Sequence, residues 1–164
     1  MPALLNHIDP NGLEEFSVVF TDRSLNHMSK EFQKVMCDLS SNLKEVYNAN
    51  AVVLVPGGGT FAMEAVARQF GNDASVLVIR NGWFSYRWSQ IFESSASARE
   101  TTVVKARMVG NESISPFMPA DVIDVVEKIK TDKPTIVFAP HVETSAGVIL
   151  PDEYIKKISA AAHE

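Results

Sequence analysis

The chain has 164 residues, of which 46% are hydrophobic and 21% charged, and its formal net charge at pH 7 is −5. These values fit one folded globular domain, and the acidic balance argues against a nucleic-acid binder, which is usually basic. No apolar run approaches the roughly 20 residues of a membrane span, and the N-terminus lacks the basic region of a secretory signal. A cytoplasmic protein is therefore the default expectation, and the single cysteine, Cys37, which cannot form an internal disulfide, agrees with a reducing compartment.

The first part of the chain predicts an irregular arm and then one long helix. Residues 1–15 carry Pro10 and Gly12 and are expected to form the arm, with the folded domain extending over residues 16–164. Within Ser29–Tyr47, apolar residues recur at helical spacing and define one face: Phe32, Val35, Met36, Leu39, Leu43, Val46 and Tyr47. Ser29 is suited to cap the first turn, and Asn48 follows the last.

Predicted strands and helices alternate over the rest of the chain. The strands are expected at 51–55, 76–79, 101–108 and 135–139, and the helices at 60–70, 83–92, 120–130 and from residue 151 onward. This alternation is typical of βαβ units and predicts an α/β fold with a mostly parallel sheet. Ligands of such sheets bind beyond the carboxyl ends of the strands. The loops 56–60, 80–87 and 140–147 are therefore expected to form one site if they meet at the same edge.

The first of these loops combines a proline, three glycines and a helix start. A helix N-terminus exposes unpaired N–H groups and the positive end of the helix dipole, and glycines let an anion approach the backbone. Since one glycine would suffice for a tight turn, the three in Pro56–Thr60 favour phosphate binding. The same turn also reads as a variant dinucleotide fingerprint, with Arg80 placed to meet a 2′-phosphate. An NADP-binding oxidoreductase domain therefore stays open as an alternative.

The other two loops are rich in aromatic and polar side chains. Four aromatic residues follow the strand at 76–79 and offer a platform for a ring, although Phe84 and Trp88 are four apart and are also suited to share a core face. The third loop, His141–Gly147, brings a histidine, a glutamate and two hydroxyl residues to the end of another strand. Its composition indicates polar contacts but leaves their role open.

Together the three loops resemble the class V aminotransferases, fold-type I enzymes that use pyridoxal 5′-phosphate (PLP). The resemblance is carried by three segments, Pro56–Ala65, Asn81–Arg87 and His141–Gly147, and is greatest to the alanine–glyoxylate and serine–pyruvate aminotransferases. It implies a three-layer α/β/α domain whose sheet is mostly parallel, of which this chain would be the N-terminal half. It also implies a homodimer that transfers an amino group from a small amino acid to a 2-oxo acid such as glyoxylate or pyruvate.

The resemblance implies a role for five residues in particular. Gly58, Gly59 and Thr60 would hold the cofactor phosphate, although relatives often carry a hydroxyl residue where Gly58 stands. Phe84 would stack on the pyridine ring, and Ser145 would form a hydrogen bond near the phenolic oxygen. Outside the cofactor contacts, Arg87 would brace the loop, while His141 and Glu143 would serve as scaffolding.

Two parts of the family's catalytic machinery have no counterpart in this sequence. The aspartate that pairs with the pyridine nitrogen and the lysine that forms the Schiff base lie, in relatives, on strands after the last helix seen here. We therefore expect a fragment or truncated product that is inactive alone and has no catalytic residue of its own. A third interpretation, a non-catalytic binding or assembly module with an exposed sheet edge, also stays open.

Overall fold

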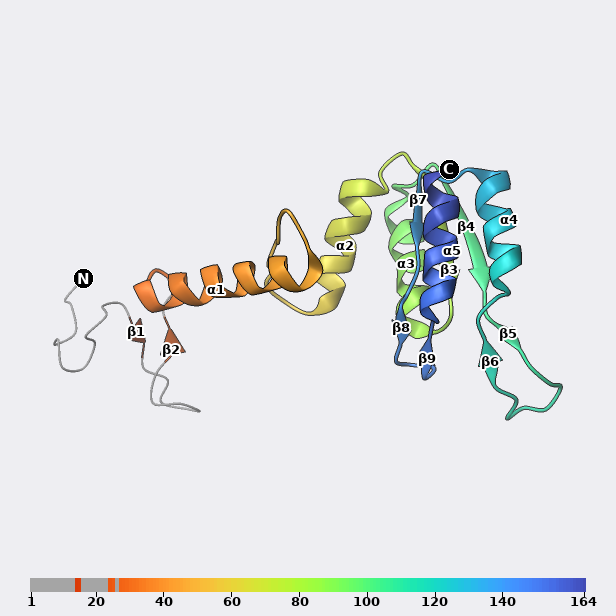
Figure 1. Ribbon diagram of the computed structural model, residues 1–164, viewed down its shortest axis with the longest axis horizontal. Coiled ribbons are helices and arrows are strands. Elements are labelled where there is room, and N and C mark those ends of the chain that lie inside the picture. The colour runs from red at the N-terminus through yellow and green to blue at the C-terminus, as the bar shows by residue number, and fades with distance from the viewer. Residues whose placement is uncertain (1–13, 16–23, 26) are drawn as a thin grey trace. The chain divides into compact units, whose positions relative to one another are not determined.

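The structure, a computed structural model, describes residues 14–15, 24–25 and 27–164. The chain divides into two compact units, Met1–Pro56 and Gly57–Glu164. Figure 1 shows the elements of both units in chain order. The arm expected over residues 1–15 lies outside the described residues except for its last two.

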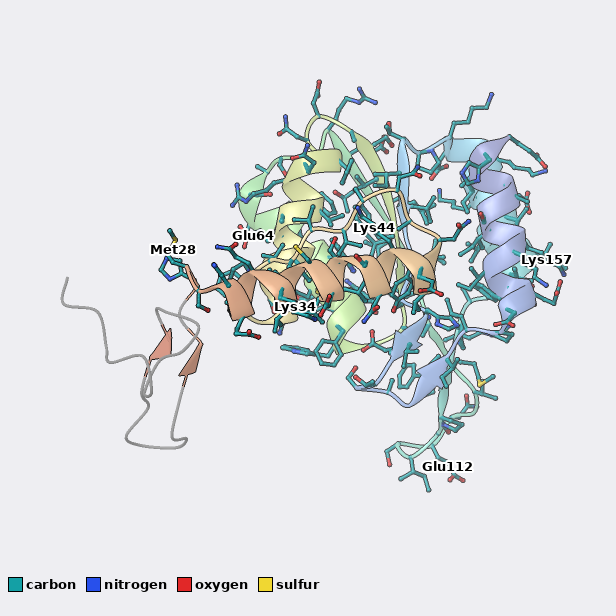
Figure 2. The ribbon with its side chains drawn as sticks, turned by 60° about the vertical axis from the view of Figure 1, so that its left-hand side comes forward. Met28, Lys34, Lys44, Glu64, Glu112 and Lys157 are labelled. Carbon is teal, nitrogen blue, oxygen red and sulfur yellow. The ribbon has the colours of Figure 1, made fainter. Side chains whose placement is uncertain are left out.

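The first unit contains one short strand pair and one long helix. Strand β1 (Glu14–Glu15) pairs antiparallel with β2 (Ser24–Leu25). Helix α1 (Lys30–Tyr47) begins where the Ser29 hydroxyl accepts a hydrogen bond from the Phe32 N–H at 3.1 Å, as a side-chain cap does. It ends at Asn48, which is left-handed with φ 48°. The predicted helix and its cap are confirmed, and Lys34 and Lys44 project from it (Figure 2).

The strand predicted over residues 51–55 is wrong. This segment has no strand conformation, and Val53 is 83% exposed. A β-strand needs a neighbour to pair its backbone N–H and C=O groups, and no described segment pairs with this one. The β-branched residues here have a high strand propensity, but the segment lacks the neighbouring strand with which it would have to pair.

A small parallel sheet forms the centre of the second unit, which makes the unit α/β. Strand β3 (Ser75–Arg80) pairs in parallel with β4 (Glu100–Lys105) on one side and with β7 (Ile136–Phe138) on the other. The register places Arg80 opposite Lys105 at the carboxyl ends of two neighbouring strands. The four residues inside β3 are fully buried, so the predicted parallel sheet and the predicted burial of this strand are confirmed.

Side chains that alternate along β3 belong to two separate apolar clusters, and each cluster contains two helices. Leu77 and Ile79 join one apolar cluster with α4 (Val122–Asp132) and α5 (Asp152–His163). Val76 and Val78 join a second cluster with α2 (Gly59–Phe70) and α3 (Trp83–Ser95). Alternate residues of a strand face opposite sides of the sheet, so the buried strand explains both clusters. The four helices lie within two or three residues of their predicted starts and ends.

Two antiparallel pairs extend the strand ends. The segment expected to continue as one strand to residue 108 breaks after Lys105 and forms β5 (Arg107–Met108), which pairs with β6 (Phe117–Met118). Glu112 lies in the loop of this hairpin (Figure 2). The third predicted loop contains β8 (Val142–Glu143) and β9 (Val148–Ile149). Over the described residues, no helix is both long and apolar enough to cross a bilayer.

Candidate functional site

The three loops predicted to form a site contact one another within the second unit. Arg87 Nη1 donates a hydrogen bond to Thr60 Oγ1 and so joins the start of α2 to α3. The backbone N–H of Trp83 donates to Ser145 Oγ at 2.8 Å, which joins α3 to the loop between β8 and β9. The loops at 56–60, 80–87 and 140–147 are therefore in contact, as a common site requires, although the first of them does not follow a strand of the sheet.

Glu143 organises the start of α3. Its side chain is fully buried, and its Oε1 accepts from the Phe84 N–H at 3.0 Å and from the Ser145 hydroxyl at 2.5 Å. Its Oε2 accepts from the Ser85 N–H at 2.8 Å and from the Ser85 hydroxyl at 2.6 Å. These bonds satisfy N–H groups that a helix leaves unpaired in its first turn. A carboxylate is also favoured there by the helix dipole, so Glu143 is scaffolding, as expected.

Two opposing effects act on the pKa of Glu143. Burial is the larger single influence and raises the pKa, because it disfavours the charged form. Hydrogen bonds from the Ser145 and Ser85 side chains and from the backbone of Ser85 and Phe84 lower it. Together these bonds outweigh burial, and the pKa lies below its ordinary value of 4.5. Glu143 is therefore a carboxylate at neutral pH and a hydrogen-bond acceptor only.

The glycine turn needs only one of its three glycines for steric reasons. Gly57 has φ +126°, and a Cβ there would lie 2.2 Å from the Phe61 ring. Both the backbone angle and the lack of space therefore disfavour any other residue at this position. Gly58 and Gly59 have ordinary backbone angles, and no heavy atom lies within 4 Å of where their Cβ atoms would stand. Gly58 caps α2 without any side-chain hydrogen bond. An open helix N-terminus of this kind is suited to an anion.

The aromatic residues at the start of α3 divide between core and surface. Trp88 packs on Phe138 with 4.5 Å between ring centroids, whereas Phe84 is 44% exposed. The alternative in which these two residues share a core face is therefore wrong. The Arg87 guanidinium lies 5.9 Å from the centroid of the Phe84 ring. The exposed Phe84 ring is therefore next to the side chain that binds Thr60. Trp83 is also exposed and packs near Tyr86, with 5.7 Å between their ring centroids.

Ser145 has a structural role in this arrangement. Its oxygen accepts from the Trp83 N–H, and its hydrogen is directed to Glu143. A hydroxyl has one hydrogen to donate, so contact with a further acceptor would require this group to rotate away from Glu143. The loop residue His141 is exposed, and in the described part of the chain no cluster of His, Cys, Asp and Glu could hold a metal ion.

Sequence reasoning gave no role to Ser85 or Asn81. Ser85 Oγ accepts from the N–H groups of Asn81 at 2.8 Å and Gly82 at 3.0 Å while donating to Glu143. A serine at the third position of a predicted helix is a signal for such local bonding. Gly82 completes the packing, because a Cβ there would lie 2.7 Å from Glu143 Cγ. Nothing in the sequence indicated the burial of the Asn81 amide.

Comparisons with known proteins add no identification. No protein-family model matches the chain, and a search of curated proteins finds no match. The class of protein that the structure itself defines is an α/β fold with a small parallel sheet.

Proposed function

We propose that this chain forms the cofactor-binding part of a PLP-dependent aminotransferase of class V and fold type I. The observation that supports the proposal is the contact between the glycine turn, the aromatic start of α3 and the loop around Ser145. These three segments also carry the resemblance to that family. Helices packed against both kinds of side chain along β3 suit the three-layer α/β/α domain in which such a site would lie.

The phosphate would bind at the start of α2. The space around Gly58 and Gly59 is open, and apart from the Phe61 N–H, which donates to the Gly58 carbonyl at 2.9 Å, the first N–H groups of a helix have no partner inside it. The Thr60 hydroxyl accepts from Arg87 and keeps its own hydrogen for a phosphate oxygen. The guanidinium of Arg87 adds positive charge beside this position, which favours a dianionic group.

The ring would stack on Phe84. This side chain is exposed, and its backbone is held by the Glu143 carboxylate. A stacking residue that is fixed in this way loses less freedom when a flat ligand binds. Ser145 fits less directly, since its hydroxyl would have to leave Glu143 before it could donate to the phenolic oxygen.

Bound PLP supplies an electron sink for reactions at the carbon atom next to an amino group. The residues here would bind the phosphate, orient the ring and exclude water from one of its faces. The proposed reaction is transfer of an amino group from a small amino acid to a 2-oxo acid such as glyoxylate or pyruvate, by a cytoplasmic homodimer. The lysine and the aspartate of that chemistry have no counterpart among the residues of this site.

Binding of pyridoxine 5′-phosphate tests the proposal on the chain as it is. This compound has the ring and the phosphate of PLP but no aldehyde, so it cannot react with surface lysines. We expect saturable binding by calorimetry, and much weaker binding of pyridoxine, which lacks the phosphate. Equal affinities for the two compounds, or no binding of either, would reject the proposal.

A further inference from the structure

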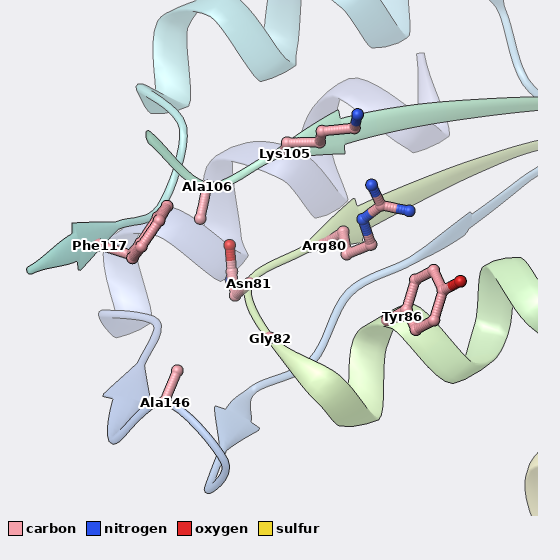
Figure 3. Close-up of a pocket in the computed structure, with 8 residues that line it drawn as sticks. All are labelled: Arg80, Asn81, Gly82, Tyr86, Lys105, Ala106, Phe117 and Ala146. Atoms are coloured by element: carbon pink, nitrogen blue, oxygen red, sulfur yellow. The ribbon is translucent and has the colours of Figure 1, made fainter. Parts of the chain in front are cut away.

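A pocket lies where β3 and β4 end. It has a volume of about 380 Å³ and is lined in part by the loop that follows β3. The residues around it are Arg80, Asn81, Gly82, Tyr86, Lys105, Ala106, Phe117 and Ala146, and Figure 3 shows them together. It shares none of these with Gly58, Gly59, Thr60, Phe84 and Ser145, so it is distinct from the proposed cofactor site.

Two cations lie side by side at this pocket. Arg80 and Lys105 are partners in the parallel register of β3 and β4, and Figure 3 shows their side chains extending to the same side of the strands. Neither forms an ion pair with any acidic side chain among the residues that the structure describes. The Arg80 guanidinium instead lies 5.1 Å from the Tyr86 ring centroid. Like charges directly opposite each other on a sheet repel, and an anion between them would remove that repulsion.

The Asn81 side chain provides a second, independent indication of a ligand. It is only 3% exposed, yet its amide oxygen and its amide nitrogen both lack a hydrogen-bond partner. Exchanging the oxygen and nitrogen would not help, because both atoms are unpaired. A buried polar group without a partner is costly and rare. In Figure 3 the amide points toward Ala106, which also lines the pocket.

The charges and the amide define the ligand together. We propose that this pocket binds a small organic anion that carries a separate hydrogen-bonding group, of the hydroxycarboxylate class. Its carboxylate lies between Arg80 and Lys105, and its hydroxyl group pairs with the Asn81 amide, which can both donate and accept. Ala106, Phe117 and Ala146 form apolar walls that suit a short carbon chain. This inference stands independently of the proposed cofactor.

Three small probes of nearly equal size separate the contribution of the carboxylate to binding from that of the hydroxyl group. 3-Hydroxybutanoate has both groups, butanoate lacks the hydroxyl and butane-1,3-diol lacks the carboxylate. In NMR titrations of the labelled chain, we expect 3-hydroxybutanoate to shift the side-chain amide signals of Asn81. Butanoate should bind about fivefold more weakly, as loss of one hydrogen bond implies, and the diol should not bind. Equal binding of the two acids, or unshifted Asn81 signals at saturation, would overturn the proposal.

Substitutions test the roles of Arg80, Lys105 and Asn81 in binding. The control substitution, at Arg107, removes one positive charge outside the pocket. Arg80→Gln and Lys105→Gln should each weaken binding of 3-hydroxybutanoate severalfold, whereas Arg107→Gln, outside the lining, should change it little. Asn81→Leu should abolish the preference for 3-hydroxybutanoate over butanoate, and its melting temperature should equal or exceed that of the parent chain, since it removes two unpaired buried groups. If Asn81→Leu fails to fold, the two cation variants decide. An Arg107→Gln effect as large as theirs would contradict the proposed site.

Discussion

The carboxylate of Glu143 accepts a hydrogen bond from the backbone N–H of Ser85 at 2.8 Å, although the two residues are 58 positions apart in the chain. This bond and the second one, from Phe84, connect the end of β8 to the first turn of α3. The orientation of Phe84 and the space beside Gly82 both depend on this connection. Glu143 is therefore the residue through which the two proposed binding sites are held in shape.

Replacement of Glu143 by glutamine should destabilise the fold. Each carboxylate oxygen accepts two hydrogen bonds, and an amide nitrogen in place of one oxygen cannot accept from a backbone N–H. We expect the free energy of unfolding in urea to fall by about 1–3 kcal/mol. Glu153→Gln, on the exposed first turn of α5, is the matched control and should change it by less than about 0.5 kcal/mol. Equal losses for the two variants would contradict the capping role.

The stability that Glu143 contributes should depend on pH. Its pKa in the folded protein is below the ordinary value of 4.5, so the ionised form is favoured by folding. The contribution is then fully present above about pH 5 and is lost as the pH falls through the folded pKa. Urea titrations of the parent chain and Glu143→Gln should converge below pH 4.5. A difference between them that is constant from pH 7 to pH 3 would contradict this assignment.

Ser145 should matter for stability and its neighbour should not. Ser145→Ala removes the acceptor for the Trp83 N–H and a donor to Glu143, and we expect a loss of about 1 kcal/mol in the free energy of unfolding. Thr144→Ala is the control, because the Thr144 side chain is exposed and only its backbone carbonyl forms a bond. If the two variants unfold at the same urea concentration, Ser145 has no structural role.

Much of the fold was predictable because its signals are local. The capping serine of α1, the apolar run of β3 and the helical spacing in α4 each report on their own segment. The failed strand over residues 51–55 shows the limit, since strand propensity does not supply a pairing partner. The rule that parallel strands end at one edge accounts for the meeting of the loops after β3 and β7, but not for the glycine turn, which follows no strand. The Glu143 network and the unpaired Asn81 amide depend on packing between distant segments, which a pattern in one sequence does not contain.

Phe84 and Trp83 offer a matched pair for the proposed stacking. Both are exposed aromatic residues at the start of α3, but only Phe84 is assigned to the cofactor ring. Phe84→Ala should weaken binding of pyridoxine 5′-phosphate by about 1 kcal/mol, from lost aromatic contact. Trp83→Ala should leave the dissociation constant almost unchanged. A larger effect for Trp83→Ala would contradict this assignment and would show that the ring stacks on Trp83 instead.

A hydroxyl at the helix cap should strengthen phosphate binding. Gly58 has extended backbone angles and no side-chain cap bond, and a serine there has open space for its side chain. Gly58→Ser should stabilise the protein by about a few tenths of a kcal/mol, which is the usual advantage of serine over glycine as a helix N-cap. It should also bind pyridoxine 5′-phosphate more tightly, through one added hydrogen bond. A gain for pyridoxine as large as that for its phosphate would show that the hydroxyl does not contact the phosphate.

The most direct test of the account is the affinity of Gly59→Asp for pyridoxine 5′-phosphate, measured together with its stability. An aspartate in the first turn of α2 has room and is favoured by the helix dipole, so the variant should unfold at the same or a higher urea concentration. The account predicts that phosphate binding is nevertheless lost, because the carboxylate occupies the position of the phosphate and repels it. Gly59→Ala, which adds no charge, should retain most of the affinity. A stable Gly59→Asp variant with unchanged affinity would contradict the assignment of the glycine turn to the cofactor phosphate.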